Sequence, residues 1–98
     1  MFASAQAAVD ASEDKFKAAS AAYNKYKEKP DSERNPMVEI RLLAAMRVAQ
    51  HAFIGDLQKL QDANMTLFAS MSDGADKTSL LETMDALSGQ ILAQLADY

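Results

Sequence analysis

The sequence has no cysteine and no tryptophan, and only one histidine, two prolines and three glycines among its 98 residues. Without cysteine, the chain can form no disulfide bond, has no thiolate nucleophile and cannot build a zinc site on sulfur ligands. A cysteine-free chain suits a reducing compartment, and it also suits a protein that is exported unfolded. No basic and apolar leader typical of a signal peptide is evident, so both a cytoplasmic and an exported location stay open.

Two further absences narrow the range of partners. No apolar run approaches the roughly 18 residues that cross a bilayer, so we expect no membrane span. The formal net charge is −4, and the three arginines, Arg34, Arg41 and Arg47, do not line one surface. A nucleic-acid-binding domain needs a basic face, so we expect no nucleic-acid partner.

What the sequence has in excess is alanine, about one residue in five, and alanine is the strongest helix former. The length fits one domain, residues 1–98, with a modest hydrophobic core. We therefore expect an all-α fold with a long antiparallel helical hairpin, residues 3–28 and 36–70, and a third helix over residues 78–97. This arrangement is a three-helix bundle with coiled-coil-like packing.

The hairpin prediction rests mainly on the spacing of residues in the middle of the chain. From Leu43, steps of three and four residues reach Met46, Gln50, Phe53, Leu57, Leu60, Asn64, Leu67 and Met71. That alternation is the seam of a helix that packs lengthwise against other helices. Such a helix is roughly 50 Å long at 1.5 Å per residue.

The ends of the expected helices carry local signals. Asn35 is a good N-cap and Pro36 suits the first helical position, so the second helix is expected to begin there. Gly74 can adopt the left-handed conformation that ends a helix. Ser79 and Glu82 have the spacing of a capping box, which predicts a third helix that begins at residue 78 or 79.

Two features of the central helix allow more than one interpretation. Gln50 and Asn64 share one column of the seam: buried amides would fix the register of the helices, whereas amides at the rim would be hydrated. Gly55 should cost roughly 1 kcal/mol relative to alanine in a helix interior. A close helix crossing or a bend would explain a glycine at this position.

The relative lengths of the helices predict a partner. The third helix is expected to fold back only to about Ala52, which leaves a layer of two helices at the other end. A two-helix layer cannot cover both sides of its apolar stripe, so apolar surface there is expected to form an interface. The expected interface residues lie on the first two helices: Phe16, Tyr23, Ile40, Leu43, Met46, Gln50, Phe53 and Ile54.

No pattern in the sequence indicates catalysis. His51 is the only histidine, and no Glu-x-x-His pair is present, so no metal site is expected. No nucleophile can be paired with a base by spacing, and no phosphate-binding glycine pattern occurs. We therefore expect no catalytic residue, no cofactor and no enzymatic activity, and we expect His51 to lie at the surface.

One segment resembles a known family. Lys29-Pro30-Asp31-Ser32-Glu33-Arg34-Asn35-Pro36 joins an alanine-rich first helix to a leucine-rich second helix. This layout resembles the needle subunits of bacterial type III secretion systems and, more loosely, the small helical chaperones that hold them. The resemblance covers about residues 5–70 and implies a helical hairpin in a secretion apparatus, with no functional residue carried over. Needle subunits end with their second helix, whereas this chain continues with Asp76–Tyr98.

Two functions are compatible with these observations. The first is a non-enzymatic helical protein that binds another helical protein or assembles with copies of itself. The alternative is a small acidic regulator or inhibitor, of the phage-encoded or immunity type, in which Asp10, Glu13 and Asp14 imitate a polyanion. Salt dependence separates the two, because a complex held by opposite charges weakens as ionic strength rises.

Overall fold

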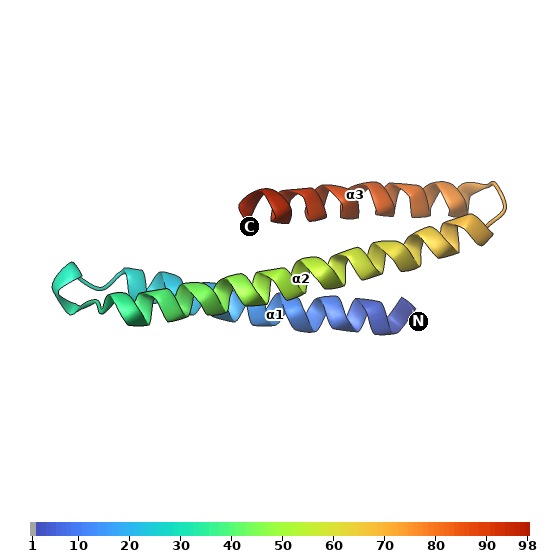
Figure 1. Ribbon diagram of the computed structural model, residues 1–98. Helices are drawn as coiled ribbons and strands as arrows, with labels where there is room; N and C mark the ends of the chain where they lie inside the picture. The colour runs from blue at the N-terminus through green and yellow to red at the C-terminus, as the bar shows by residue number, and fades with distance from the viewer. Residues whose placement is uncertain (1) are drawn as a thin grey trace.

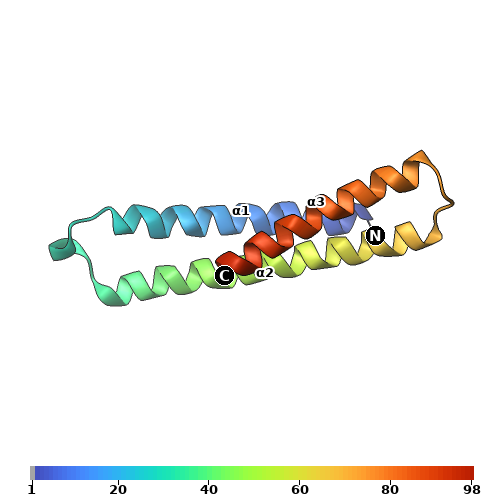
Figure 2. The same ribbon diagram turned by 90° about the horizontal axis from the view of Figure 1, so that it is seen from above.

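The computed structural model describes residues 2–98, most of which belong to three α-helices (Figure 1). α1 spans Phe2–Lys27, α2 spans Pro36–Ser70 and α3 spans Ala75–Asp97, and a short 3₁₀ turn, η1, spans Asp31–Glu33. Both α1 and α3 run antiparallel to α2, and each packs along it (Figure 2). The predicted all-α, three-helix architecture is confirmed, and residues 2–98 contain no β-strand.

The central helix begins at the predicted position. Asn35 Oδ1 accepts a hydrogen bond from the Met37 backbone nitrogen at 2.9 Å, and Pro36 occupies the first turn, where a missing N–H costs no hydrogen bond. α2 then continues through Gly55 to Ser70 without a break. It has 35 residues, which corresponds to an axis of about 52 Å. The long central rod predicted from the heptad spacing is therefore confirmed.

α3 begins earlier than the sequence predicts. Its first residue is Ala75, and the preceding Gly74 has φ 158° and ψ −174°, a conformation open mainly to glycine. The Thr78 backbone nitrogen already donates to Gly74 O at 3.1 Å, so helical hydrogen bonding starts at Gly74. Ser79 lies inside the helix, and the predictions of a capping box and of a helix-ending Gly74 are both wrong.

The early start of α3 changes how far it reaches along α2. Arg47 Nη1 donates to the carbonyl oxygen of Asp97 at 3.0 Å, so α3 ends beside Arg47 rather than beside Ala52. The loop between Ser70 and Ala75 is short, so α3 turns back at once and covers about one more turn of α2 than predicted. The turn-proximal part of α2, before Arg47, has only α1 beside it.

The molecule is an elongated rod, with principal extents of 62 × 21 × 14 Å. Its Cα radius of gyration is 17.6 Å, whereas a compact domain of this length has a radius of about 13 Å. Close backbone approaches join α1 to α2 and α2 to α3, but none joins α1 to α3 within residues 2–98. α2 is therefore the element on which the other two helices depend.

The hydrophobic core lies where all three helices overlap. Its buried apolar residues are Val9, Phe53, Leu57, Leu60 and Leu87, which come from all three helices. The ring of Phe16 in α1 stacks on that of Phe53, with centroids 5.9 Å apart. Burial of each large side chain contributes about 1.5–3 kcal/mol, so this overlap supplies most of the hydrophobic stabilisation.

Candidate protein–protein interface

The eight residues predicted to form an interface divide into three groups. Gln50, Phe53 and Ile54 are buried, with exposed fractions of 0%, 2% and 4%, and so have no free surface for a partner. Half-buried positions are occupied by Phe16, Tyr23, Leu43 and Met46. Ile40 is the one exposed member, at 59%. Most of the predicted interface residues are therefore wholly or partly covered by the chain itself.

Gln50 fastens the end of α3 to α2. Its Oε1 accepts a hydrogen bond from Arg47 Nη1 at 2.8 Å, and its Nε2 donates to Gln94 Oε1 at 3.1 Å and to Asp97 Oδ2 at 2.8 Å. Both polar atoms of this fully buried amide are thus satisfied, which offsets the cost of removing them from water. Of the two readings left open by the sequence, the structure supports a buried amide that fixes register.

Asn64 is also buried, at 1% exposed, but it is less well satisfied. Its Nδ2 donates to Gln61 Oε1 at 3.4 Å, and its Oδ1 has no hydrogen-bond partner within residues 2–98. Gln61 in turn donates to Met84 O at 2.9 Å and to Ser88 Oγ at 2.7 Å on α3. The pair of amides therefore holds α3 in place while leaving one buried acceptor unpaired.

A pocket of about 360 Å³ opens between α1 and α3 over α2. Core side chains line it together with Asn64, and Asp10 and Glu13 line its α1 side. Both carboxylates already have partners, since Asp10 accepts from Gln6 Nε2 at 3.0 Å and Glu13 lies 3.5 Å from Lys17 Nζ. The pocket is the place where the acidic residues of the alternative hypothesis meet a concave surface.

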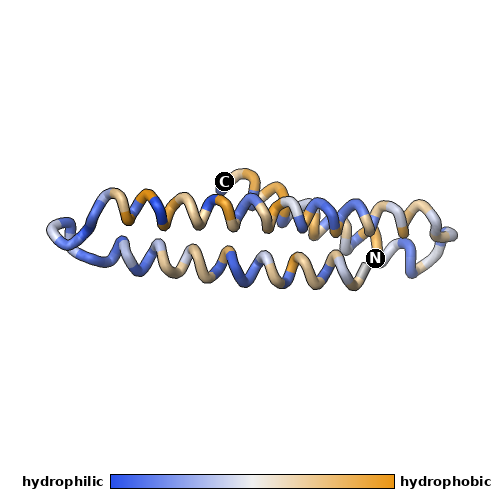
Figure 3. The backbone as a smooth tube through the Cα atoms, turned by 60° about the horizontal axis from the view of Figure 1, so that its bottom comes forward, coloured by the Kyte–Doolittle hydropathy of each residue, from blue (hydrophilic) through white to orange (hydrophobic). Residues whose placement is uncertain are grey.

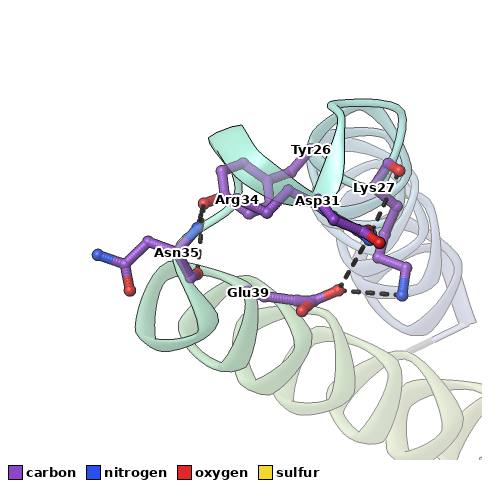
Figure 4. A network of polar contacts seen from close by, with 6 residues as sticks. All are labelled: Tyr26, Lys27, Asp31, Arg34, Asn35 and Glu39. Atoms are coloured by element: carbon purple, nitrogen blue, oxygen red, sulfur yellow. Dashed lines mark hydrogen bonds and ion pairs between the residues drawn. The ribbon is translucent and has the colours of Figure 1, made fainter.

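The turn between α1 and α2 is held by a network of polar contacts (Figure 4). The Asn35 backbone nitrogen donates to Tyr26 Oη at 2.6 Å. Glu39 lies 3.0 Å from Lys27 Nζ and 3.8 Å from Arg34 Nη1, and Arg34 also pairs with Asp31. These contacts tie the end of α1 to the start of α2, so this segment is structurally explained without a ligand.

The large exposed apolar side chains gather on two of the three helices. None lies on α1 between residues 3 and 27, and in Figure 3 the strongly hydrophobic segments are more frequent on α2 and α3 than on α1. The exposed set is Met37, Val38, Ile40, Val48, Met65, Leu67, Leu81, Leu92, Leu95 and Tyr98. Such side chains, when they are contiguous on a surface, mark an interaction site.

The interface predicted from the sequence omits a second series of residues on α2 with the same three-and-four spacing. We name it the outer seam, and it comprises Met37, Arg41, Ala44, Val48, His51, Gly55, Gln58, Asp62 and Met65. All of these are exposed except the half-buried Gly55. Its mixed polarity hides it in the sequence, because an apolar pattern alone selects the buried seam.

His51 lies on the outer seam and is exposed, with its ring 5.8 Å from that of Tyr98. Within residues 2–98, no group of three histidine, aspartate or glutamate side chains is close enough to hold a metal ion. No helix in this range is long and apolar enough to cross a membrane. Comparison with known protein families, curated proteins and solved structures gives no match.

Proposed function

We propose that this protein is a non-enzymatic helix-packing subunit that binds a helical protein, either a second copy or a different chain. The observation that carries the proposal is the uneven distribution of exposed apolar side chains. α1 covers one side of α2 and exposes no large apolar residue between positions 3 and 27, whereas α2 and α3 expose many. Helices with uncovered apolar stripes are stabilised by further helices that cover them.

The shape of the molecule supports the same proposal. A rod with extents of 62 × 21 × 14 Å offers its long side for lateral packing. The resemblance of the Lys29–Pro36 turn to type III secretion needle subunits makes a bacterial secretion apparatus, or a chaperone of one, the proposed setting. The third helix, which needle subunits lack, then supplies additional packing surface.

The test compares two exposed valines on α2. Val48, 70% exposed, lies on the outer seam, and Val38, 40% exposed, lies off it. The wild-type chain, Val48→Glu and Val38→Glu are each tagged and cross-linked in the native host. We expect one specific complex that Val48→Glu loses and Val38→Glu keeps, while circular dichroism shows unchanged helicity in all three. A complex that both variants retain, or no complex at all, contradicts the proposal.

The pocket between α1 and α3 favours a second candidate, the acidic regulator. Asp10 and Glu13 both line it, so a basic side chain of a target protein could enter there. In that case, Asp10→Asn combined with Glu13→Gln abolishes the complex while Val48→Glu does not. The complex would also dissociate when the salt concentration is raised, because the attraction between exposed charges is screened.

A further inference from the structure

The outer seam faces the side of α2 opposite to α1. α1 packs on Phe53 and its neighbours in the buried seam, while outer-seam residues such as Val48 and Met65 are 70% and 54% exposed. Residues at three-and-four spacing form one straight stripe along a helix. The outer seam is therefore a continuous strip that runs from the first turn of α2 to beyond the core.

α3 contributes a second exposed apolar strip on the same side of the molecule as the outer seam. Thr83, Ala86 and Gln90 line the pocket toward α1, so they define the α1-facing side of α3. Each residue in an α-helix is turned by about 100° from the previous one. Leu87 and Ile91 pack inward toward the core. Positions turned by about half a turn from Thr83, Ala86 and Gln90 point away from α1. These are Leu81, Leu92 and Leu95, which are 52%, 65% and 47% exposed.

Gly55 supplies an independent observation. It lies in the middle of an unbroken helix, where glycine costs roughly 1 kcal/mol relative to alanine. A Cβ atom added there would meet nothing within 4 Å, so no crossing inside the chain requires a glycine. Because the distance between two packed helices depends on the side chains at their contact, a glycine on the outer seam suits close approach by a helix of another chain.

The charges on the outer seam indicate that the other chain is a second copy of this protein. Arg41 lies ten residues before His51, toward the α1–α2 turn, and Asp62 lies eleven residues after it, so their midpoint falls between His51 and Ala52. Neither side chain forms an ion pair within the part of the chain that the structure describes. A second copy that runs antiparallel about an axis near His51 places each Arg41 opposite the other copy's Asp62.

The same antiparallel register also places Val48 opposite Gly55. Val48 and Gly55 are also equally distant from the midpoint between Arg41 and Asp62. In the antiparallel arrangement, each Val48 therefore packs against the Gly55 of the other copy, where the absence of a side chain leaves room. A two-fold interface of this kind is self-complementary, so it closes at two copies.

The surface area is consistent with such a dimer. The chain exposes 6597 Å², whereas a compact monomer of this mass exposes roughly 5,500 Å². The excess of about 1,100 Å² exceeds the roughly 800 Å² that each partner buries in a standard interface. We propose that the protein forms an antiparallel homodimer in which the outer seam of α2 packs against its copy and Leu92 and Leu95, near the end of α3, lie beside the two-fold axis.

This inference rests on the proposed function and names its partner, so the first test uses the purified chain alone. Sedimentation equilibrium from about 1 μM to about 1 mM detects dimers whose dissociation constants fall in that range. The expected mass rises from the 10.7 kDa of one chain to twice that value. A single-chain mass throughout overturns the dimer. The proposed function then still stands if the native host yields a complex of different chains that Val48→Glu loses.

Charge reversal tests the antiparallel register. Arg41→Asp alone and Asp62→Arg alone each place like charges together, so each should weaken dimerisation about tenfold or more. The double variant restores opposite charges in both copies and should recover most of the wild-type affinity. Retained affinity in the single variants, or no recovery in the double variant, overturns the register.

Glycine replacement tests the close approach at Gly55. Gly55→Ala should make the dilute monomer more resistant to urea and, at the same time, weaken dimerisation several-fold, because the added methyl group meets Val48 of the other copy. Gly89→Ala is the matched control, since Gly89 is an exposed helical glycine with open space around it. It should raise urea resistance and leave dimerisation unchanged. An unchanged dimer in Gly55→Ala contradicts this packing.

Discussion

The two hairpins that share α2 differ in how firmly polar contacts hold their turns. In the α1–α2 hairpin, Asn35 caps α2 with its side chain, and Lys27 and Arg34 both approach Glu39. In the α2–α3 hairpin, Gly74 precedes α3 without a side-chain cap, and Lys77 of α3 pairs with the fully exposed Asp73 and lies 4.7 Å from the centre of the Phe68 ring. Exposed ion pairs contribute little, about 0–1 kcal/mol, so the second turn is held less firmly than the first.

α1 and α3 also differ in how much apolar surface they leave exposed, and α1 is again the more completely covered. α1 turns its bulky residues toward α2, and its outer side carries small or charged residues. α3 turns one apolar strip toward α2 and leaves a second strip in solvent. The comparison shows that α1 exposes no large apolar side chain between residues 3 and 27, while α2 and α3 keep several in solvent.

The largest expected effect comes from breaking the core that both hairpins share. Phe53 is 2% exposed and stacks on Phe16, so Phe53→Ala removes buried surface and leaves a cavity. We expect a loss of about 3–5 kcal/mol in the free energy of unfolding, measured by urea denaturation of dilute protein. Leu92→Ala, at a 65% exposed position, is the control and should change this value by less than about 0.5 kcal/mol. Similar losses in both variants would contradict the difference between covered and uncovered strips.

An intermediate effect should come from the buried amides that hold α3. Asn64→Leu removes the unpaired Oδ1, and the adjoining pocket has room for the larger side chain. We expect the free energy of unfolding to rise by about 1–2 kcal/mol. Gln50→Leu is the matched control, because it removes an amide with three partners and should lower stability by about 1 kcal/mol. Equal destabilisation by the two changes would mean that Asn64 is better satisfied than the geometry indicates.

The smallest expected effect comes from substitutions near the N-terminal ends of α2 and α3. Asn35→Ala removes the side-chain cap of α2 and should lower the free energy of unfolding by about 1 kcal/mol. Ser79→Ala alters a residue inside α3 that caps nothing, so its effect should stay within about 0.5 kcal/mol of zero. Thermal or urea unfolding followed at 222 nm measures both. A larger loss from Ser79→Ala would restore the capping box that the structure contradicts.

The parts of the fold that could be predicted from the sequence depend on strong local signals. Asn35 followed by Pro36 fixes the start of α2, and the regular seam from Leu43 fixes its length, since both depend only on neighbouring residues. The predicted start of α3 is wrong, because Gly74 precedes the helix with a positive φ of 158°, which is unusual for an N-cap, and Ser79 has the spacing of a capping box. The overlap of α3 with α2 was underestimated for the same reason.

The candidate interface was harder to predict than the fold. Phe53 and Ile54 are apolar on either a buried or an exposed seam, so composition alone does not show which face α1 and α3 will take. The burial of Gln50 depends on Arg47, Gln94 and Asp97, two of which are more than 40 residues away. Once these contacts are assigned, the outer seam is the long strip of α2 that stays exposed, and the role proposed for Gly55 and Arg41 follows from that placement rather than from spacing.

The slenderness of the rod affects how its size is measured in solution. A compact protein with the same 17.6 Å radius of gyration would have roughly 240 residues. Gel filtration responds to the Stokes radius, which elongation raises less than the radius of gyration, so one chain will elute ahead of a globular standard of its 10.7 kDa mass. Elution volume alone would overestimate the mass even of a monomeric Val48→Glu, so light scattering or sedimentation must supply the molar mass.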